Sequence, residues 1–341
     1  MPEPPGGLTR ARLLEMMTAY KATYLLRAAV RLRVFDALAG GPADPDTVAA
    51  ILRTDPRGTR VLLRALAAAG LLHVDGEEFR LPPGADELLV TGSPQYSGGV
   101  TEVAASRWEW DAMADLDDIV RHGGTRLDVN AETPGFPYWV DFATHQTFAT
   151  VPGARFVADL LADWAADRDP LRILDVGCGS ATFGGTLAAR HPHARLTGLD
   201  WPSVLEVAGK SLGALGVADR FTPLPGDVFT ADLTGPYDVV ILANVMMLFD
   251  AARGTALLRR LRAHMRPGGR AVIVGFTTGD AAPVQDYHAH MLELLMLALT
   301  EGGELHSTTA YRKMLASSGF AEPTVHTSQG LPLRFVEGTA A

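Results

Sequence analysis

The sequence predicts an α/β protein in which a mostly helical first part precedes an open, largely parallel sheet with helices on both faces. Residues 11–81 show apolar residues at helical spacing and then a short hairpin pattern, whereas β-rich runs alternate with helical segments after Pro170. Such alternation is typical of a parallel sheet, because its crossover connections bring helices onto both faces. The last two β-rich runs are separated by a short turn and predict an antiparallel hairpin that closes the sheet.

The first part has the order of elements of a winged helix. Apolar residues at helical spacing predict one or two helices within 11–40 and two aspartate-capped helices within 44–69. Asp75-Gly76 stands between two short β-rich runs and predicts a tight hairpin turn. Three helical segments followed by a hairpin predict a winged-helix domain over residues 1–95.

The remainder divides near residue 166. Residues 96–165 are predicted as a helical linker, interrupted at Gly123-Gly124 and at 133–137. Residues 166–341 are predicted as the sheet domain. Its main β-rich runs lie at 173–176, 196–199, 239–242, 271–274, 322–326 and 333–336.

Composition and charge exclude several classes of protein. With 47% hydrophobic and 20% charged residues among 341, the composition is that of a soluble protein with a sizeable core. No apolar run reaches the roughly 18 residues of a membrane span and no signal peptide is recognisable, so we expect a cytoplasmic protein without a membrane partner. The single cysteine, Cys178, excludes an intrachain disulfide. Residues 1–100 carry 11 basic and 11 acidic residues in a chain of net charge −9, which argues against nucleic acid as a partner.

A glycine-rich loop follows the first predicted strand of the sheet. Gly177 and Gly179 stand between this strand and the next helix, where glycine lets the backbone approach a ligand and the helix N-terminus offers free N–H groups. Asp200 ends the second strand, 21 residues after Gly179, where a carboxylate can accept hydrogen bonds from both hydroxyls of a ribose. The spacing predicts a site for a ligand that contains a nucleoside.

The acidic residues around this loop indicate the kind of ligand. A dinucleotide site would have a third glycine where this chain has Thr182, and Asp175 beside the loop would repel a pyrophosphate. Asp227 follows a further strand, expected between the runs at 196–199 and 239–242, and there it could accept a hydrogen bond from an adenine amino group. Three carboxylates around a glycine loop favour a cation that carries adenosine.

The chain resembles class I S-adenosylmethionine-dependent methyltransferases in four segments, which are Asp175-Val-Gly-Cys-Gly-Ser, Gly198-Leu-Asp-Trp-Pro, Gly226-Asp-Val-Phe and Met265-Arg-Pro-Gly-Gly. With the winged helix and residues 110–123 and 302–320, these segments resemble the small-molecule O-methyltransferases of the acetylserotonin, plant phenolic and bacterial antibiotic-tailoring type. The resemblance implies a Rossmann-like catalytic domain, a winged-helix dimerisation domain and a linker, residues 96–165, that contributes to the acceptor pocket.

The resemblance also implies the cofactor and the partners. S-adenosylmethionine would donate the methyl group and leave as S-adenosylhomocysteine, without a metal ion. The chain would act as a homodimer on a small molecule of specialised metabolism. The implied cofactor-binding residues are Asp175, Gly177, Gly179, Asp200, Trp201, Asp227, Val228, Phe229 and Asn244.

One residue departs from the family pattern where the reaction would occur. Many relatives carry a histidine that removes the proton of the acceptor hydroxyl, and Met247 stands in its place. Methionine cannot act as this base, and the supporting glutamate of plant relatives aligns only loosely with residues 303–306. We therefore expect methylation of carbon or nitrogen in an aromatic or enol-type acceptor, because such nucleophiles can attack first and lose the proton afterwards. The alternatives are O-methylation with another base and a reaction that uses the cofactor without transferring its methyl group. A winged-helix DNA-binding regulator is a further alternative, against which the charge balance of residues 1–100 argues.

Another proton acceptor could lie on residues 286–293. Asp286, His290 and Glu293 would share one helix face, and His290, Glu293 and His145 are the candidate catalytic residues. The candidate acceptor-binding residues are Trp110, Phe142, Met247 and Met291. The alternative is that the polar residues form a solvated helix face and that the aromatic residues belong to the core.

Overall fold

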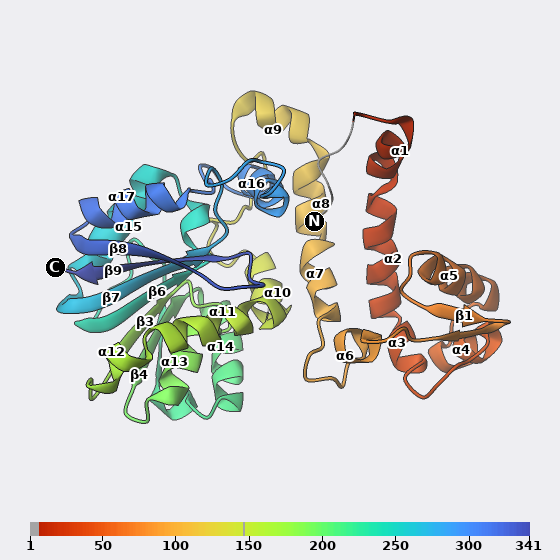
Figure 1. Cartoon of the computed structure of the whole chain (residues 1–341), viewed down its shortest axis with the longest axis horizontal. Coiled ribbons are helices and arrows are strands. Elements are labelled where there is room, and N and C mark those ends of the chain that lie inside the picture. The colour runs from red at the N-terminus through yellow and green to blue at the C-terminus, as the bar shows by residue number, and fades with distance from the viewer. Residues whose placement is uncertain (1–6, 146) are drawn as a thin grey trace. The chain divides into compact units, whose positions relative to one another are not determined.

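The computed structural model describes residues 7–145 and 147–341. By their internal contacts these residues form two compact units, one that extends to Arg107 and one that runs from Trp108 to Ala341. Each unit has its own buried core. Figure 1 shows the ribbon of both units. No helix within the described ranges is both long and apolar enough to cross a lipid bilayer.

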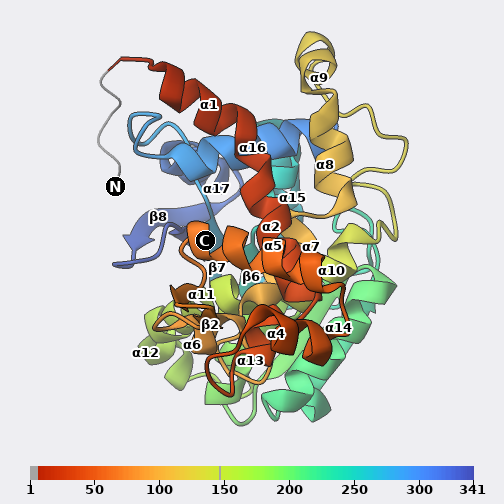
Figure 2. The same ribbon diagram turned by 90° about the vertical axis from the view of Figure 1, so that its right-hand side faces the viewer.

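The N-terminal unit packs helices beside a two-stranded hairpin. β1 (His73–Asp75) and β2 (Glu78–Arg80) pair antiparallel on either side of Gly76, as the sequence predicts. Phe35, Leu63 and Leu66 are fully buried in the core of this unit. Figure 2 shows the helices of the unit from a second side. The helices are α1 (Arg10–Thr18), α2 (Tyr20–Arg31), α3 (Val34–Ala37), α4 (Pro45–Leu52), α5 (Pro56–Ala68), α6 (Ala85–Leu89), the 3₁₀ helix η1 (Gly98–Val100) and α7 (Thr101–Ala104).

The first helical segment is more divided than the sequence predicted. Residues 11–40 contain three helices, because Arg33 adopts a left-handed conformation with φ 59° that α2 cannot continue through. The next two helices begin as expected. Asp44 and Asp55 cap α4 and α5 by accepting hydrogen bonds from N–H groups of the first turn.

A seven-stranded sheet forms the centre of the C-terminal unit. β3 to β7 pair in parallel and β8 and β9 pair antiparallel at one edge, which confirms the predicted sheet. β5 lies at the other edge, where a strand tolerates Pro223 and Pro225. The strands, in the spatial order β5-β4-β3-β6-β7-β9-β8, are β3 (Arg172–Val176), β4 (Arg195–Asp200), β5 (Phe221–Pro225), β6 (Tyr237–Ala243), β7 (Met265–Gly275), β8 (Phe320–Thr327) and β9 (Arg334–Ala340).

Helices cover both faces of this sheet (Figure 1). One face packs against α11 (Thr147–Leu160), α12 (Ala162–Ala166), α13 (Thr182–Arg190) and α14 (Pro202–Ala214). The other packs against α15 (Ala251–Arg262) and α17 (Thr308–Ser317). The remaining elements are α8 (Arg107–Ala114), α9 (Leu116–His122), α10 (Tyr138–His145), α16 (Tyr287–Leu299) and the 3₁₀ helices η2 (Ala218–Arg220) and η3 (Met246–Leu248).

The order of the strands places a crevice at one end of the sheet. From β3 the chain proceeds outward to β4 and β5, and it then returns to β6 on the other side of β3. The loops that follow β3 and β6 therefore diverge at the carboxyl ends of these strands, which is where open α/β sheets bind ligands. Helix α10 lies at this end, since the loop after β3 approaches Ala143.

Candidate active site

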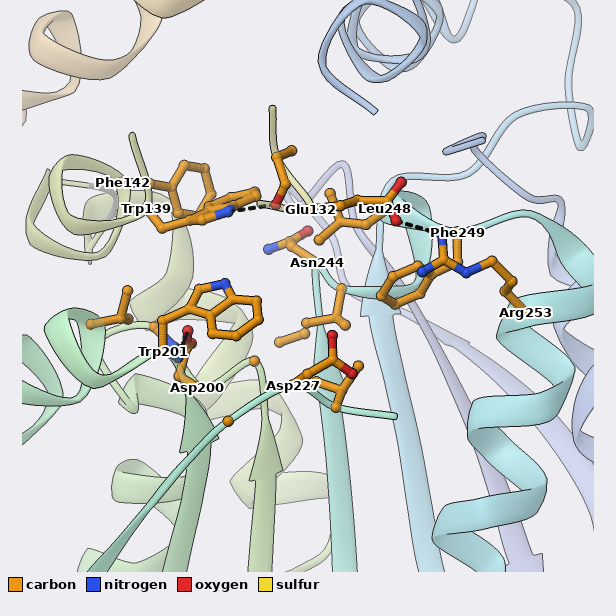
Figure 3. Close-up of a pocket in the computed structure, with 18 residues that line it drawn as sticks. Glu132, Trp139, Phe142, Asp200, Trp201, Asp227, Asn244, Leu248, Phe249 and Arg253 are labelled. Carbon is orange, nitrogen blue, oxygen red and sulfur yellow. Dashed lines mark hydrogen bonds and ion pairs between the residues drawn. The ribbon is translucent and has the colours of Figure 1, made fainter. Parts of the chain in front are cut away.

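A cavity of about 180 Å³ lies at the carboxyl ends of β3, β4 and β6 (Figure 3). Its walls include the glycine loop after β3 and Asp200 and Trp201 at the end of β4. Across the cavity, Trp139 and Phe142 of α10 face Trp201 (Figure 3). Aromatic rings on opposite walls and a carboxylate at the base of the cavity are suited to a flat ring with a polar, hydroxyl-bearing attachment.

The glycine loop has a backbone that other residues would distort. Gly177 and Gly179 both have positive φ, 59° and 55°. A Cβ atom on Gly177 would lie only 2.4 Å from Cγ2 of Val245, a residue of the segment after β6. The loop can therefore approach this segment only because residue 177 has no side chain.

Asp200 is held in position by its own backbone surroundings. One carboxylate oxygen accepts the Gly179 N–H at 2.8 Å and the other accepts the Trp201 N–H at 2.7 Å. Burial raises the pKa of Asp200 to about 6, although these two hydrogen bonds favour the ionised form. At neutral pH the site therefore has a carboxylate that is already oriented.

Asp175 occupies a different place from the one expected for a residue in contact with a ligand. Asp175 is only 1% exposed and does not line the cavity. Its carboxylate accepts the Gly184 N–H at 2.8 Å, beneath the glycine loop. Burial raises the pKa of Asp175 to about 7, and the nearby Asp200 charge contributes to the increase. The carboxyl group connects β3 to α13 and supports the loop from behind.

The other predicted cofactor residues lie at or just behind the cavity. Trp201, Asp227, Val228 and Asn244 line it, whereas Phe229 packs with its ring edge against Phe249, which does line it. Asn244 has a left-handed backbone, φ 57°. Its buried Oδ1 has no hydrogen-bond partner among the described residues, so it is an acceptor that a ligand could satisfy.

The cavity wall also contains an ion pair that the sequence did not indicate. Glu132, from the segment between α9 and α10, contacts Arg253 in the first turn of α15, with 2.5 Å between Oε2 and Nη1. The two residues are 121 positions apart. No local spacing relates them, so only the folded chain shows that they meet.

Met247 does not line the cavity. It is 6% exposed and belongs to a buried apolar cluster with Ala289, Met296 and Leu305. Leu305 is in the segment to which the supporting glutamate of plant relatives aligned only loosely. The place expected for a proton-accepting pair is therefore filled by packed apolar side chains. Leu248, the neighbour of Met247, lines the cavity and packs against the same cluster.

His290 and Glu293 form a pair on α16. The His290 Nδ1 atom lies 3.2 Å from Glu293 Oε2, and Glu293 Oε1 lies 3.5 Å from the Thr278 hydroxyl. Thr278 in turn donates a hydrogen bond to the Leu305 carbonyl at 2.9 Å, which places the pair beside the apolar cluster. The Nε2 atom of His290 is buried and has no partner among the described residues. Asp286 precedes α16 and does not extend this helix face.

Of the other expected acceptor-site residues, the cavity wall includes Phe142 alone. Trp110 and His145 are half-buried and do not border the cavity, and Met291 is 42% exposed. The described part of the chain contains no group of three histidine, cysteine, aspartate or glutamate side chains that could hold a metal ion.

Comparisons with known proteins relate both parts of the chain to O-methyltransferases. A family model described as the O-methyltransferase domain matches residues 115–321, and one described as the O-methyltransferase dimerisation domain matches residues 14–91. Acetylserotonin O-methyltransferase of Mus musculus molossinus is 30% identical, over 93% of this chain and 85% of its own. The N,N-dimethyltransferase OxyT of Streptomyces rimosus is 29% identical, over 93% and 92%.

A solved structure extends the likeness to the fold. A Nostoc punctiforme protein described as a candidate O-methyltransferase is 28% identical, covers 98% of this chain and 100% of its own, and has a TM-score of 0.90. With the sheet, the glycine loop and the family match over most of its length, the chain belongs to the O-methyltransferase family of methyltransferases.

Proposed function

We propose that the protein transfers a methyl group from S-adenosylmethionine to a carbon or nitrogen atom of a small aromatic or enol-type molecule. The assignment of this cofactor is supported mainly by the Asp200 carboxylate. Two backbone N–H groups orient it at the base of a cavity lined with aromatic side chains. S-adenosylmethionine, when bound, supplies a methyl group on a positively charged sulfur. The residues present fit this group, because Asn244 Oδ1 is a buried acceptor without a partner in the described part of the chain and the ligand has amino and hydroxyl donors.

Each lining residue has a distinct role in this proposal. Asp200 accepts hydrogen bonds from the ribose hydroxyls, and Asp227 accepts from the adenine amino group beside Val228 and Phe229. Trp201 packs against the adenine. Gly177 and Gly179 let the backbone approach the methionine part, and Asp175 supports this loop without touching the ligand.

The choice of carbon or nitrogen is supported by the buried cluster of Met247 and Leu305. Neither Met247 nor Leu305 can accept a proton, so the residues at these two positions could not deprotonate a hydroxyl before it attacks. A neutral aromatic amine or an electron-rich carbon needs no such step, because its own electron pair forms the new bond and the proton leaves later. The similarity to a relative named as an N,N-dimethyltransferase agrees with this proposal.

We further propose that His290 receives the proton that the acceptor loses. Its buried Nε2 atom has no partner among the residues that the structure describes, and Glu293 at Nδ1 would hold the ring in place. The same pair could serve as the base if the acceptor is a hydroxyl, which is the alternative reaction. Trp110, Phe142 and Met291 remain the candidates for contact with the acceptor, and His145 remains a further candidate catalytic residue.

Replacing His290 by alanine is expected to lower kcat by about 100-fold at pH 7, which is the lower end of general acid–base effects. His288→Ala is the matched control, because His288 is exposed on the same helix, two residues away. The rate of methyl transfer from labelled cofactor should be measured at pH 7 for the wild type and both variants, and His288→Ala should retain the wild-type rate. Equal rates for the two variants would exclude His290 as the proton acceptor.

The homodimer is also part of this proposal. Helices α1 and α2 carry a row of exposed apolar side chains, and this segment lies within the match to the dimerisation domain. A row of neighbouring exposed apolar side chains is typical of an interface. The residues are Leu13, Leu14, Met16, Met17, Tyr20 and Tyr24. Light scattering after gel filtration should give twice the mass of the 36.3 kDa chain.

The proposed function is tested first by calorimetric titration with S-adenosylmethionine and S-adenosylhomocysteine. Products from panels of indoles, arylamines, phenols and 2-oxo acids are then analysed by mass spectrometry. We expect binding of both ligands and the gain of one or two methyl groups on nitrogen or carbon. Binding without methyl gain would favour a reaction that only uses the cofactor's charge. Absence of binding would contradict the proposed cofactor.

A further inference from the structure

The ion pair between Glu132 and Arg253 belongs to the wall of the cavity and yet joins distant parts of the chain (Figure 3). Arg253 lies in the first turn of α15, close to where β6 leads out of the sheet. Glu132 lies in the segment 130–133 before α10. Both residues border the cavity, and Arg253 lies beside Phe229, which the proposal places near the adenine.

Each member of the pair is fixed by further contacts. The Arg253 guanidinium carbon lies 5.1 Å from the centre of the Phe229 ring and 4.9 Å from that of Phe249, within the range of cation–π attraction. Glu132 Oε1 accepts the Glu301 N–H at 3.1 Å while Oε2 contacts Arg253. The Glu132 side chain is 17% exposed, so water screens this pair less than it screens a surface ion pair.

The segment that carries Glu132 is also attached to the end of α16. The Ala131 N–H donates to the Leu299 carbonyl at 2.8 Å. The Ala131 carbonyl accepts the indole N–H of Trp139, another residue of the cavity wall, at 2.9 Å. If Arg253 moved away from Glu132, the segment 130–133 and Trp139 would therefore lose their connection to α15. These two walls of the cavity could then separate.

We propose that Glu132 and Arg253 form a closing ion pair that slows dissociation of the adenosine-containing ligand from the cavity. Glu132 acts through Arg253 and is a positioning residue. This inference rests on the proposed function, since it requires the cavity to hold S-adenosylmethionine and S-adenosylhomocysteine. Because product release follows every turnover, the pair would influence how long the used cofactor blocks the site.

The test is the dissociation rate of tritium-labelled S-adenosylhomocysteine, measured by chase with excess unlabelled ligand. Glu132→Gln removes the charge and keeps an oxygen for the Glu301 N–H. We expect dissociation to become about tenfold faster, with less than a threefold change in the association rate. We also expect added salt to accelerate dissociation from the wild type and to have little effect on the variant.

Glu337→Gln is the matched control. Glu337 pairs with Arg270 at 3.4 Å with similar exposure, 14% and 29%, on strands β9 and β7 and outside the cavity wall. A purely structural role for Glu132 would make both variants lower the melting temperature and leave both dissociation rates as in the wild type. That result would overturn the inference.

Arg253→Gln and the double variant complete the cycle. If the two residues act as a pair, the double variant releases the ligand no faster than the faster single variant, whereas independent effects would multiply. Arg253→Gln also tests the inference alone if Glu132→Gln does not fold. A wild type that does not bind S-adenosylhomocysteine would contradict the proposed function itself. Binding by the wild type with unchanged dissociation from folded variants would contradict the closing pair alone.

Discussion

Replacing Asp200 by alanine is expected to weaken binding of S-adenosylmethionine by about 10- to 100-fold. Hydrogen bonds to a charged group contribute about 1.5–3 kcal/mol, and this carboxylate is oriented before the ligand arrives. The loss should be seen in calorimetric titrations with both S-adenosylmethionine and S-adenosylhomocysteine, because both have the same ribose. Asp219→Ala, at an exposed position, is the control and should bind as the wild type does.

The pH dependence of binding tests the same residue. Burial raises the pKa of Asp200 to about 6, so in the free protein the carboxyl group becomes protonated as the pH falls below that value. A protonated carboxyl must lose its proton before both oxygens can accept from the ribose. Affinity should therefore decrease from pH 7 to pH 5, by up to about tenfold for each unit below the pKa. Asp200→Asn should remove this dependence, and a wild-type affinity that stays constant over the range would contradict the assignment.

Replacing Gly177 by alanine is expected to lower the free energy of unfolding by about 2–3 kcal/mol and to abolish most cofactor binding. A left-handed conformation costs a residue with a Cβ atom about 1–2 kcal/mol. In addition, the new atom would lie 2.4 Å from Val245 Cγ2, so the glycine loop or the segment after β6 must move. Urea denaturation and calorimetric titration measure the two effects separately.

Gly179→Ala is the matched control for this substitution. Its φ of 55° is nearly the same, but its Cβ atom would meet only the Ala143 Cβ at 4.0 Å. It should therefore show the backbone cost without the collision. Adding Val245→Ala to Gly177→Ala should recover part of the lost stability. Equal destabilisation by both glycine variants would show that the close approach to Val245 is unimportant.

Local patterns were sufficient to predict most of the fold. The β-rich runs and the glycine loop are contiguous in the sequence, and each reflects a backbone requirement within a few residues. Arg33 was missed because its left-handed conformation has no sequence signal comparable to that of glycine. The antiparallel hairpin of β8 and β9 was visible because its two strands are separated by one short turn.

The candidate site was predictable only in part, for a physical reason. Asp200 ends β4 and Asp227 follows β5, so topology brings both residues to the carboxyl ends of the parallel strands. Glu132 and Arg253 meet through packing of segments that the sequence does not relate. The placement of Asp175 behind the loop depends on a hydrogen bond to Gly184, which is inside a helix and carries no motif.

The packing of Met247 with Leu305 limits how this enzyme could gain a new chemistry by mutation. A single change of Met247 to histidine would bury an imidazole among apolar side chains without a partner, which costs about 1–3 kcal/mol. A change of Leu305 to glutamate alone would bury an isolated carboxyl group. Each substitution is unfavourable without the other, although a histidine and a glutamate introduced together could form a pair. A single substitution at either Met247 or Leu305 is thus expected to preserve the present choice of acceptor. A library designed to introduce a proton-accepting pair here must vary both positions at once.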